Sequence, residues 1–360
     1  MFAYKEVLER DPFSLAKEEK TSFLTERILE LTAYHQSRCL PYKNMMRTVG
    51  FDEGTVRSYE QIPFLPVRIF KEMELRSIAE EHIFKTITSS GTTGQKKSKI
   101  FLDQETATEQ HKTLVRVVSD FTKSQRMPMI IIDCPGVLKN PAMFSARGSA
   151  IMGFSIFGRQ RIYALNDDME LEFDRLQHFL AQHEGERIFL FGFTFMIWQH
   201  FYQALRSRKE KLNLSNAVLI HGGGWKKMIQ DAVSPEEFKQ GLQEVCDLPE
   251  VYNFYGMAEQ SGCIYMECSQ GHFHAASYFD VLIRRPQDFS IAPIGERGII
   301  QVVSVLPKSY PGHSLLTEDE GMLMGEDDCL CGRKGKYFKV FGRLKNAEIR
   351  GCSDTYAAGL

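Results

Sequence analysis

Residues 86–103, with the sequence TITSSGTTGQKKSKIFLD, form the stretch that decides how this chain is interpreted. Small hydroxyl side chains and glycines are followed here by lysines, in the order Ser89, Ser90, Gly91, Thr92, Thr93, Gly94, Lys96, Lys97 and Lys99. Glycines let backbone N–H groups turn inward, hydroxyls donate hydrogen bonds and lysines add positive charge, which together suit a polyphosphate. A surface turn has a similar composition, and the spacing is neither that of a Walker loop nor that of a dinucleotide-binding loop. Other motifs must therefore decide whether this segment binds phosphate.

The composition is that of an ordinary globular protein. The 360 residues are 43% hydrophobic and 25% charged, with a formal net charge of -2, which gives no electrostatic reason to expect nucleic acid or an anionic membrane as a partner. The first residues carry charges of both signs, unlike a secretory signal, and the apolar run at 188–198 is too short to span a bilayer. The eight cysteines are scattered. We therefore expect a cytoplasmic protein whose thiols are free or bind metal.

The N-terminal part has helical periodicity. Residues 14–36 place one apolar face on a helix, made by Phe23, Leu24, Ile28, Leu31 and Tyr34. Pro63 and Pro66 then force the backbone into an extended conformation. Apart from this break, the first eighty residues are expected to be mostly helical.

The rest of the chain has an α/β pattern. Short apolar runs at 129–133, 188–193, 217–220 and 251–254 alternate with helix-length amphipathic segments. Such alternation predicts a mostly parallel sheet covered by helices. Two apolar runs after residue 292 are separated by turn residues and predict a small antiparallel β unit.

The order Ser-Ser-Gly-Thr-Thr-Gly-x-x-Lys in residues 89–97 resembles the phosphate loop of the adenylate-forming superfamily of acyl-CoA synthetases, luciferases and peptide-synthetase adenylation domains. The resemblance implies that the loop holds the β- and γ-phosphates of ATP while a carboxylate attacks the α-phosphorus. Lys97 matches the catalytic lysine of that loop, and Lys96 stands where proline is usual.

Two further motifs of the superfamily follow in the same order. HGGGW resembles the segment against which adenine lies, and its glycines allow the ring to approach the backbone at Gly222, Gly223 and Gly224. YGMAE resembles the Tyr-Gly-x-Thr-Glu motif, which implies that Tyr255 stacks on adenine beside Gly256 and that Glu259 binds Mg²⁺. Ala258 replaces the threonine of that motif.

The last two motifs would bind the ribose. LLTEDEG resembles the Thr-Gly-Asp motif, which gives Asp319 the ribose hydroxyls, although Glu318 replaces the glycine. FGRLKN resembles the Gly-Arg hinge, which makes Arg343 a second ribose contact. Adenylation builds negative charge on phosphorus, so cations and donors placed in advance at these positions would stabilise it.

Superfamily members continue after the hinge with a mobile lid domain, whereas this chain stops soon after Arg343, so we expect the lid to be absent. IPFLPVRIFKEMEL, the phosphate loop and HGGGWKK are similar to the acyl-protein synthetase of bacterial luminescence operons, a resemblance that covers nearly the whole chain. That family carries its acyl group on a cysteine near the C-terminus and passes it to a reductase subunit. Cys352 is at the matching place, and a thiolate there is a competent nucleophile.

The resemblance predicts the large N-terminal domain of the adenylate-forming fold, in four consecutive parts. These are a helical segment at 1–85, the ATP- and acyl-binding α/β core at 86–290, the small β unit at 291–341 and the hinge remnant with its cysteine tail at 342–360. We expect the first part to pack on the others as one structural unit.

The implied function is ATP- and Mg²⁺-dependent activation of a fatty or other carboxylic acid to acyl-AMP. The acyl group then passes to Cys352 and on to an acceptor protein such as an acyl reductase or carrier. Two alternatives stay open: an acyl- or aryl-CoA ligase of the phenylacetate type, and a nucleotide-binding relative without catalysis, which Ala258 and Glu318 would favour.

A second group of residues has the chemistry of a metal site. ECSQGHFH and CLCG bring together, about 55 residues apart, the candidate Zn²⁺ ligands Cys268, His274, Cys329 and Cys331. His274 is preferred to His272 because it begins the next expected strand. Phenylacetate-CoA ligases show a similar Cys-x-Cys-Gly, while buried free cysteines are a common alternative.

The acyl pocket has no clear signature. Alternating aromatic residues could line an acyl tunnel, but they are more often the core of a sheet: Phe189, Phe191, Phe193, Phe195 and Trp198.

Overall fold

The computed structural model describes residues 4, 9–88, 97–123, 126–139, 146–208, 211–225 and 232–344. These residues divide into two compact units. The first unit contains the described residues up to Asp120 together with those from Tyr255 onward, and the second contains those between Phe121 and Phe254. The boundaries expected at residues 85, 290 and 341 stay predictions.

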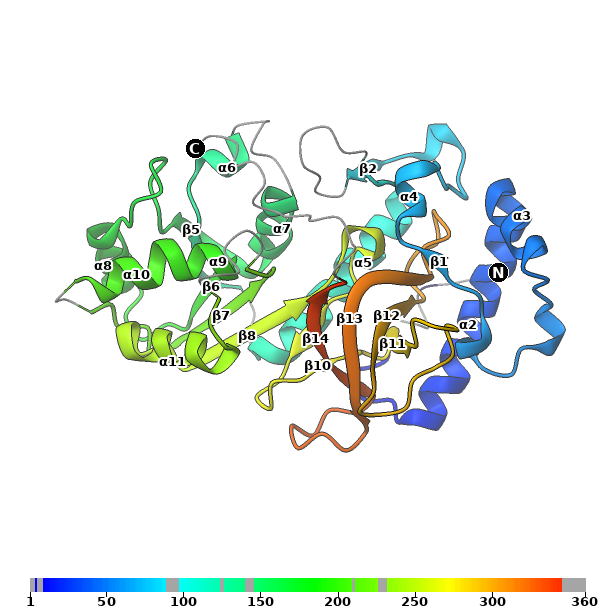
Figure 1. Ribbon diagram of the computed structural model, residues 1–360. Helices are drawn as coiled ribbons and strands as arrows, with labels where there is room; N and C mark the ends of the chain where they lie inside the picture. The colour runs from blue at the N-terminus through cyan, green and yellow to red at the C-terminus, as the bar shows by residue number, and fades with distance from the viewer. Residues whose placement is uncertain are drawn as a thin grey trace. The chain divides into compact units, whose positions relative to one another are not determined.

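A parallel sheet forms the centre of the second unit (Figure 1). Its strands are neighbours in the order β5-β4-β6-β7-β8, and every pair among them is parallel. Their bounds are β4 Met127–Ile132, β5 Gly158–Tyr163, β6 Ile188–Phe193, β7 Ala217–Gly222 and β8 Glu250–Tyr255. The four apolar runs that predicted a parallel sheet each form one of these strands, so that prediction is confirmed.

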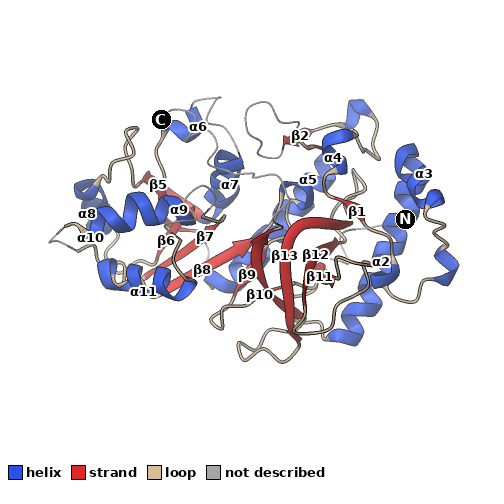
Figure 2. Cartoon of the chain, viewed as in Figure 1, coloured by secondary structure: helices blue, strands red, loops and turns tan. Residues whose placement is uncertain are grey.

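Helices pack on both faces of this sheet, because its strands β4, β6 and β7 are buried along their whole length. The helices of the unit are α6 Gly136–Lys139, α7 Ala146–Phe154, η4 Ser155–Phe157, α8 Phe173–Gln182, α9 Thr194–Met196, the π-helix η5 Ile197–Tyr202, α10 Gln203–Arg206 and α11 Pro235–Cys246. One core packs α8, η5, α10 and α11 against the sheet (Figure 2). Alternate residues of β6 face the other side of the sheet. There the ring of Phe191 stacks on that of Phe154 of α7, with 4.2 Å between the ring centroids.

The aromatic residues considered for an acyl tunnel are packed in this unit. Phe189 and Phe191 have no exposed surface, and Phe193 and Phe195 are buried. Trp198 stacks on Tyr202 and Phe238 within the core between η5 and α11. These contacts are those of a sheet core.

An antiparallel sheet forms the centre of the first unit, with the order β11-β12-β13-β14-β10-β9. Its strands are β9 Tyr265–Glu267, β10 Phe273–His274, β11 Phe279–Arg284, β12 Arg297–Ser304, β13 Ser314–Glu326 and β14 Lys336–Arg343. Short β1 (Leu65–Pro66) adds a parallel pairing to β13, and β2 (Lys85–Thr88) pairs with β3 (Lys99–Leu102) separately. The antiparallel arrangement expected after residue 292 is confirmed, and the sheet extends beyond it to β9–β11.

The helices of the first unit come mainly from the N-terminal part, as the periodicity predicted. They are α2 Lys17–Arg38, α3 Leu40–Thr48, η1 Glu53–Thr55, η2 Tyr59–Gln61, α4 Ile69–Glu72, η3 Glu80–His82, α5 Gln104–Thr122, which crosses into the second unit, and η7 Ala258–Gln260. Helix α2 buries Phe23, Leu24, Ile28 and Leu31 and turns Glu26 to solvent. None of the described helices is long and apolar enough to cross a membrane.

A buried ion cluster ties α2 to the antiparallel sheet. The Lys20 ammonium lies 3.3 Å from Asp280 Oδ1, and Lys336 Nζ lies 3.6 Å from Asp280 Oδ2. The Tyr59 hydroxyl donates to the same carboxylate. Burial opposes ionisation of Asp280, but the two ammonium groups hold its pKa below the ordinary carboxyl value. Asp280 therefore lies between two buried cations from opposite ends of the sequence, one of which, Lys336, also pairs with Glu60 at 3.0 Å.

We predict that Asp280→Asn lowers the free energy of unfolding by about 3–5 kcal/mol, because it leaves two buried ammonium groups without their shared anion. Urea denaturation measures the loss. The exposed Asp174→Asn is the control and should change stability by about 0.5 kcal/mol or less. Equal effects of the two substitutions would contradict the role given to Asp280.

Two stacked histidines are buried beside α2. The rings of His35 and His313 lie 5.0 Å apart, and both side chains have 1% or less exposed surface. His35 Nε2 donates to the Pro307 carbonyl and Nδ1 accepts from the Ser77 hydroxyl. Burial lowers the pKa of His313 to about 3, and burial together with His313 holds the pKa of His35 well below its ordinary value. Both rings are therefore neutral in the folded state.

The unfolded chain takes up protons on these histidines near pH 6.5, whereas the folded protein does not until far lower pH. Stability is therefore complete above pH 6.5 and falls with decreasing pH, by about 1.4 kcal/mol per pH unit for each histidine. Urea denaturation between pH 7 and pH 4 should show this slope, and His313→Gln should reduce it. An unchanged slope in that variant, or a reduction of the same size in the exposed His82→Gln, would refute the assignment.

Candidate functional site

Three residues predicted to contact the nucleoside lie at the ends or bends of strands in the first unit. Tyr255 ends β8, Asp319 lies in β13 and Arg343 ends β14. The pairing of β13 with β14 places Asp319 opposite Arg343. The Tyr255 hydroxyl donates to Asp319 Oδ2 at 2.8 Å, and Arg343 Nε lies 3.9 Å from Asp319 Oδ1. The structure therefore brings these three side chains together.

The electrostatics of this group keep Tyr255 protonated. Burial and the neighbouring Asp319 carboxylate raise the pKa of Tyr255 well above its ordinary value, so the phenol stays a hydrogen-bond donor. Tyr255 also meets the ring of Phe338 edge-on at 6.1 Å. An anchored carboxylate with an adjacent guanidinium can bind a pair of neighbouring hydroxyl groups.

Glu318, which stands where the superfamily has glycine, is part of the same group. Its carboxylate lies 2.8 Å from Arg68 Nε and 3.6 Å from Arg343 Nη1. The backbone carbonyl of Glu318 also accepts from the N–H of Leu344, just after β14. The side chain of Glu318 thus contacts Arg343, and its backbone carbonyl binds the residue that follows β14. The motif comparison did not predict this role.

Glu259, the predicted Mg²⁺ ligand, lies in the short helix η7 and is buried. The neighbouring Gln260 fixes this turn by donating to the carbonyls of Val302 and Gly312. Glu259 Oε1 is buried and has no hydrogen-bond partner among the residues that the structure describes. A buried carboxylate oxygen that lacks a hydrogen-bond donor is suited to bind a cation.

The glycine-rich segment expected beside adenine lies in the second unit, at the carboxyl end of β7. A Cβ at Gly222 would lie 2.4 Å from the Phe254 ring, and Gly223 has a positive φ of 77°. Thr194 donates to the Gly223 carbonyl at 2.7 Å and contacts His221 Nδ1 at 2.9 Å. Ligands of parallel α/β sheets bind at this end of the strands.

Other predicted residues fall partly outside the described chain. Lys97 is described and exposed, two residues before β3, and Gly256 is exposed after β8. The remaining phosphate-loop residues and the predicted acyl acceptor lie outside the described residues: Ser89, Ser90, Gly91, Thr92, Thr93, Gly94 and Cys352. Their roles stay predictions.

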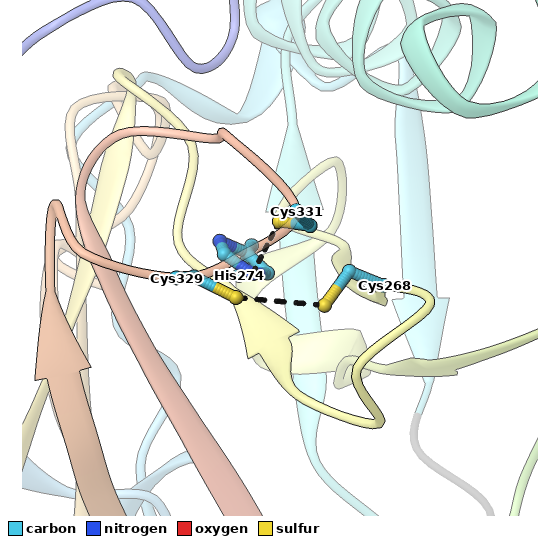
Figure 3. Close-up of side chains that lie close together, drawn as sticks. All are labelled: Cys268, His274, Cys329 and Cys331. Atoms are coloured by element: carbon cyan, nitrogen blue, oxygen red, sulfur yellow. Dashed lines mark hydrogen bonds between the residues drawn. The ribbon is translucent and has the colours of Figure 1, made fainter.

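The candidate metal ligands Cys268, His274, Cys329 and Cys331 converge (Figure 3). Their ligand atoms all lie within 4.8 Å of one another. Cys268 Sγ is 3.9 Å from Cys329 Sγ, and Cys331 Sγ is 3.3 Å from His274 Nε2. His272 contacts Cys329 at 3.7 Å but is not a member of this group.

The two turns that carry cysteines of this cluster have the same local structure. In Cys268-x-x-Gly271 and Cys329-x-x-Gly332, the glycine N–H donates to the cysteine carbonyl at 2.9 Å. Both glycines have positive φ, 72° and 83°, which other residues adopt at a cost. The repeated Cys-x-x-Gly spacing was visible in the sequence and could have indicated two matching turns.

The protonation states in the cluster depend on burial and local donors. Burial lowers the pKa of His274 to about 3 and raises the pKa of Cys329 to about 12. Burial also raises the pKa of Cys331, but hydrogen bonds from the Arg333 backbone and from Cys329 and Cys268 bring it below the ordinary thiol value. A neutral imidazole beside a thiolate-forming cysteine is what a soft divalent cation requires.

A family model described as acyl-protein synthetase, LuxE, matches residues 3–360. The chain belongs to this family. Two relatives, both named long-chain-fatty-acid--luciferin-component ligase, agree with the match. The Vibrio harveyi protein is 23% identical over 337 residues, covering 92% of this chain and 86% of its own. The Aliivibrio fischeri protein is 21% identical over 344 residues, covering 93% and 88%.

The fold is that of adenylate-forming ligases. A 2-hydroxyisobutyryl-CoA ligase, solved in an open conformation with 2-HIB-AMP and CoA, superposes with a TM-score of 0.69. The similarity covers 94% of this chain and 78% of that one, at 17% sequence identity. The predicted family and fold class are both confirmed. Members of the LuxE family are acyl-protein synthetases, and this chain is an ATP-dependent acyl-activating ligase.

We predict that Asp319→Asn raises the KM for ATP about tenfold in ATP–pyrophosphate exchange, because it removes a charged acceptor beside Tyr255 and Arg343. Initial exchange rates over a range of ATP concentrations measure the change. Asp288→Asn, at an exposed turn of the same unit, is the control. A KM equal to that of the unmodified protein would show that Asp319 does not bind the nucleotide.

Proposed function

We propose that this chain joins a long-chain fatty acid to AMP, transfers the acyl group to its own Cys352 and delivers it to an acceptor protein. The observation that carries the proposal is the group formed by Tyr255, Asp319 and Arg343, on which three motifs separated by up to 88 residues converge. The names of the two relatives support a fatty acid as the substrate.

In the first step a carboxylate oxygen of the fatty acid attacks the α-phosphorus of ATP. The bond to the bridging oxygen breaks, and pyrophosphate leaves as acyl-AMP forms. Asp319 and Arg343 would hold the ribose, Tyr255 would hold adenine, and residues 89–94 with Lys97 would hold the terminal phosphates. Such placement of donors and cations before the reaction stabilises the charge that builds on phosphorus.

Two metal ions belong to the proposal. Mg²⁺ would bind at Glu259, whose buried Oε1 fits a hard cation, and it would neutralise charge on the phosphates. Zn²⁺ would be held by Cys268, His274, Cys329 and Cys331, a donor set of three thiolates and one imidazole that is typical of structural zinc.

In the second step the Cys352 thiolate attacks the acyl carbonyl, AMP leaves, and a thioester forms. A thioester keeps most of the activation derived from ATP and can pass to another thiol by the same exchange. Support for Cys352 comes from its position after the Gly-Arg hinge and from membership of the acyl-protein synthetase family.

The molecule that accepts the acyl group, a protein thiol or CoA, distinguishes this function from that of a CoA ligase. The solved structure compared above is that of a CoA ligase, whereas the matching family model is described as an acyl-protein synthetase. ATP–pyrophosphate exchange across a panel of carboxylic acids, followed by transfer with CoA or with a thiol-bearing acyl reductase, separates the two. Release of acyl-CoA at a rate above that of protein acylation would favour the ligase.

We predict that Cys352→Ser abolishes acylation of the protein while ATP–pyrophosphate exchange continues, since only the second step needs the thiol. Incubation with ATP and a radiolabelled fatty acid, followed by hydroxylamine treatment, measures the thioester. Cys39→Ser, at a buried cysteine outside every predicted site, is the matched control and should keep the label. A hydroxylamine-sensitive label on the Cys352→Ser protein would rule out this acceptor.

A further inference from the structure

The four metal-ligating side chains connect two hairpins of the antiparallel sheet. Cys329 and Cys331 lie in the loop between β13 and β14, while Cys268 and His274 flank the turn between β9 and β10 (Figure 3). Strand β10 pairs with β14, with His274 opposite Tyr337. The cluster therefore closes one end of the β13–β14 hairpin, and Asp319 and Arg343 lie toward its other end.

The distances fit a tetrahedral zinc site. With Zn–S bonds of about 2.3 Å and a Zn–N bond of about 2.0–2.1 Å, neighbouring ligand atoms should be about 3.5–3.8 Å apart. The structure has 3.9 Å between Cys268 Sγ and Cys329 Sγ, and 3.3 Å between Cys331 Sγ and His274 Nε2. The two sulfur atoms at 3.9 Å are too far apart for a disulfide, which needs about 2.05 Å.

The two Cys-x-x-Gly turns prepare the cysteines for a shared ion. In each, a left-handed glycine closes the turn. The Gln270 N–H also points at Cys268 Sγ, at 3.4 Å, and hydrogen bonds of this kind stabilise a thiolate. The positively charged side chain of Arg333 follows Cys331 by two residues, and its guanidinium pairs with Asp120 at 2.7 Å.

The β13–β14 pairing is irregular. Its register shifts twice, between Glu320 and Gly321 and between Leu323 and Gly325. A slip of one residue would turn Asp319 to the opposite face and away from Arg343, because successive side chains of a strand point to opposite sides. A link at the closed end of the hairpin opposes that slip.

We infer that Zn²⁺ bound by Cys268, His274, Cys329 and Cys331 fixes the register of the β13–β14 hairpin and thereby holds Asp319 and Arg343 in position for the nucleotide. The ion has a structural role and does not touch the reacting atoms. This inference rests on the proposed function for its nucleotide part only, since the metal itself can be measured without any substrate.

Loss of the metal should leave the unit folded. The loop between β13 and β14 keeps other tethers: Asp327 accepts from the backbone N–H groups of Gly335 at 2.7 Å and Lys17 at 2.8 Å, and Arg333 keeps its pair with Asp120. A metal-free variant can therefore be assayed. Its nucleotide affinity, not its ability to fold, reports on the hairpin.

The test begins with the metal content of the purified full-length protein, measured by inductively coupled plasma mass spectrometry. We expect about one zinc per chain, and Co²⁺ substitution should produce thiolate-to-cobalt charge-transfer bands. Cys331→Ser and Cys268→Ser should lose the metal, whereas Cys39→Ser should keep it. Absence of zinc from the unmodified protein, iron in its place, or zinc retained by both cluster variants would overturn the site.

The second measurement follows the hairpin. In metal-free Cys331→Ser, amide hydrogen exchange in residues 314–343 should be faster than in the Cys39→Ser control, and the KM for ATP in the exchange assay should rise several-fold with a smaller change in kcat. An unchanged KM in a protein that has lost its zinc would overturn the link to the nucleotide. Zinc present in a protein without any ATP–pyrophosphate exchange would instead refute the proposed function and leave the metal site standing.

Discussion

The pairing of β13 with β14 is the constraint on which the rest of the first unit depends. It sets Asp319 opposite Arg343, and its connecting loop carries Cys329 and Cys331 to the turn that holds Cys268. At the start of β14, Lys336 reaches Asp280 of β11 and Glu60 of η2. One strand pairing therefore organises the candidate ribose site, the candidate metal site and the buried ion cluster.

These three groups are polar networks with different balances of charge. In the ion cluster, Asp280 lies between two buried ammonium groups, one of which also pairs with Glu60, so its members depend on each other for solvation. The group around Asp319 is half-exposed, with Arg343 at 33% and Arg68 at 52% of their side-chain surface, and its charges remain available to a ligand. The candidate metal cluster has three cysteines and a histidine whose imidazole is kept neutral by burial. Burial thus separates the ion cluster, which holds the fold, from the group around Asp319, which can bind a ligand.

Most of the secondary structure could be predicted from short segments of sequence, because helices and strands depend on the periodicity of neighbouring residues. The apolar run at 188–193 became β6 with the same limits, and the amphipathic run after residue 14 became α2. The convergence of Tyr255 with Asp319 was predicted from the order of motifs that resemble those of the superfamily. No single segment of the sequence has a pattern that indicates it. Glu318 was only noted as a departure from the motif, since its partner Arg68 lies 250 residues away in the chain. The stacked pair His35 and His313 was equally invisible, because neither histidine has a local signature.

The sequence by itself determined the strands and helices, the family and the types of residue available for phosphate, ribose, metal and acyl chemistry, since each of these depends on periodicity or on short ordered motifs. Only the tertiary structure decided which of those residues meet. It brought the three cysteines and His274 to one place, paired Glu318 with Arg343 and packed the aromatic residues of β6 into a core. The physical reason is that strand register and loop closure bring together side chains that are far apart along the chain, and no local pattern encodes those distances.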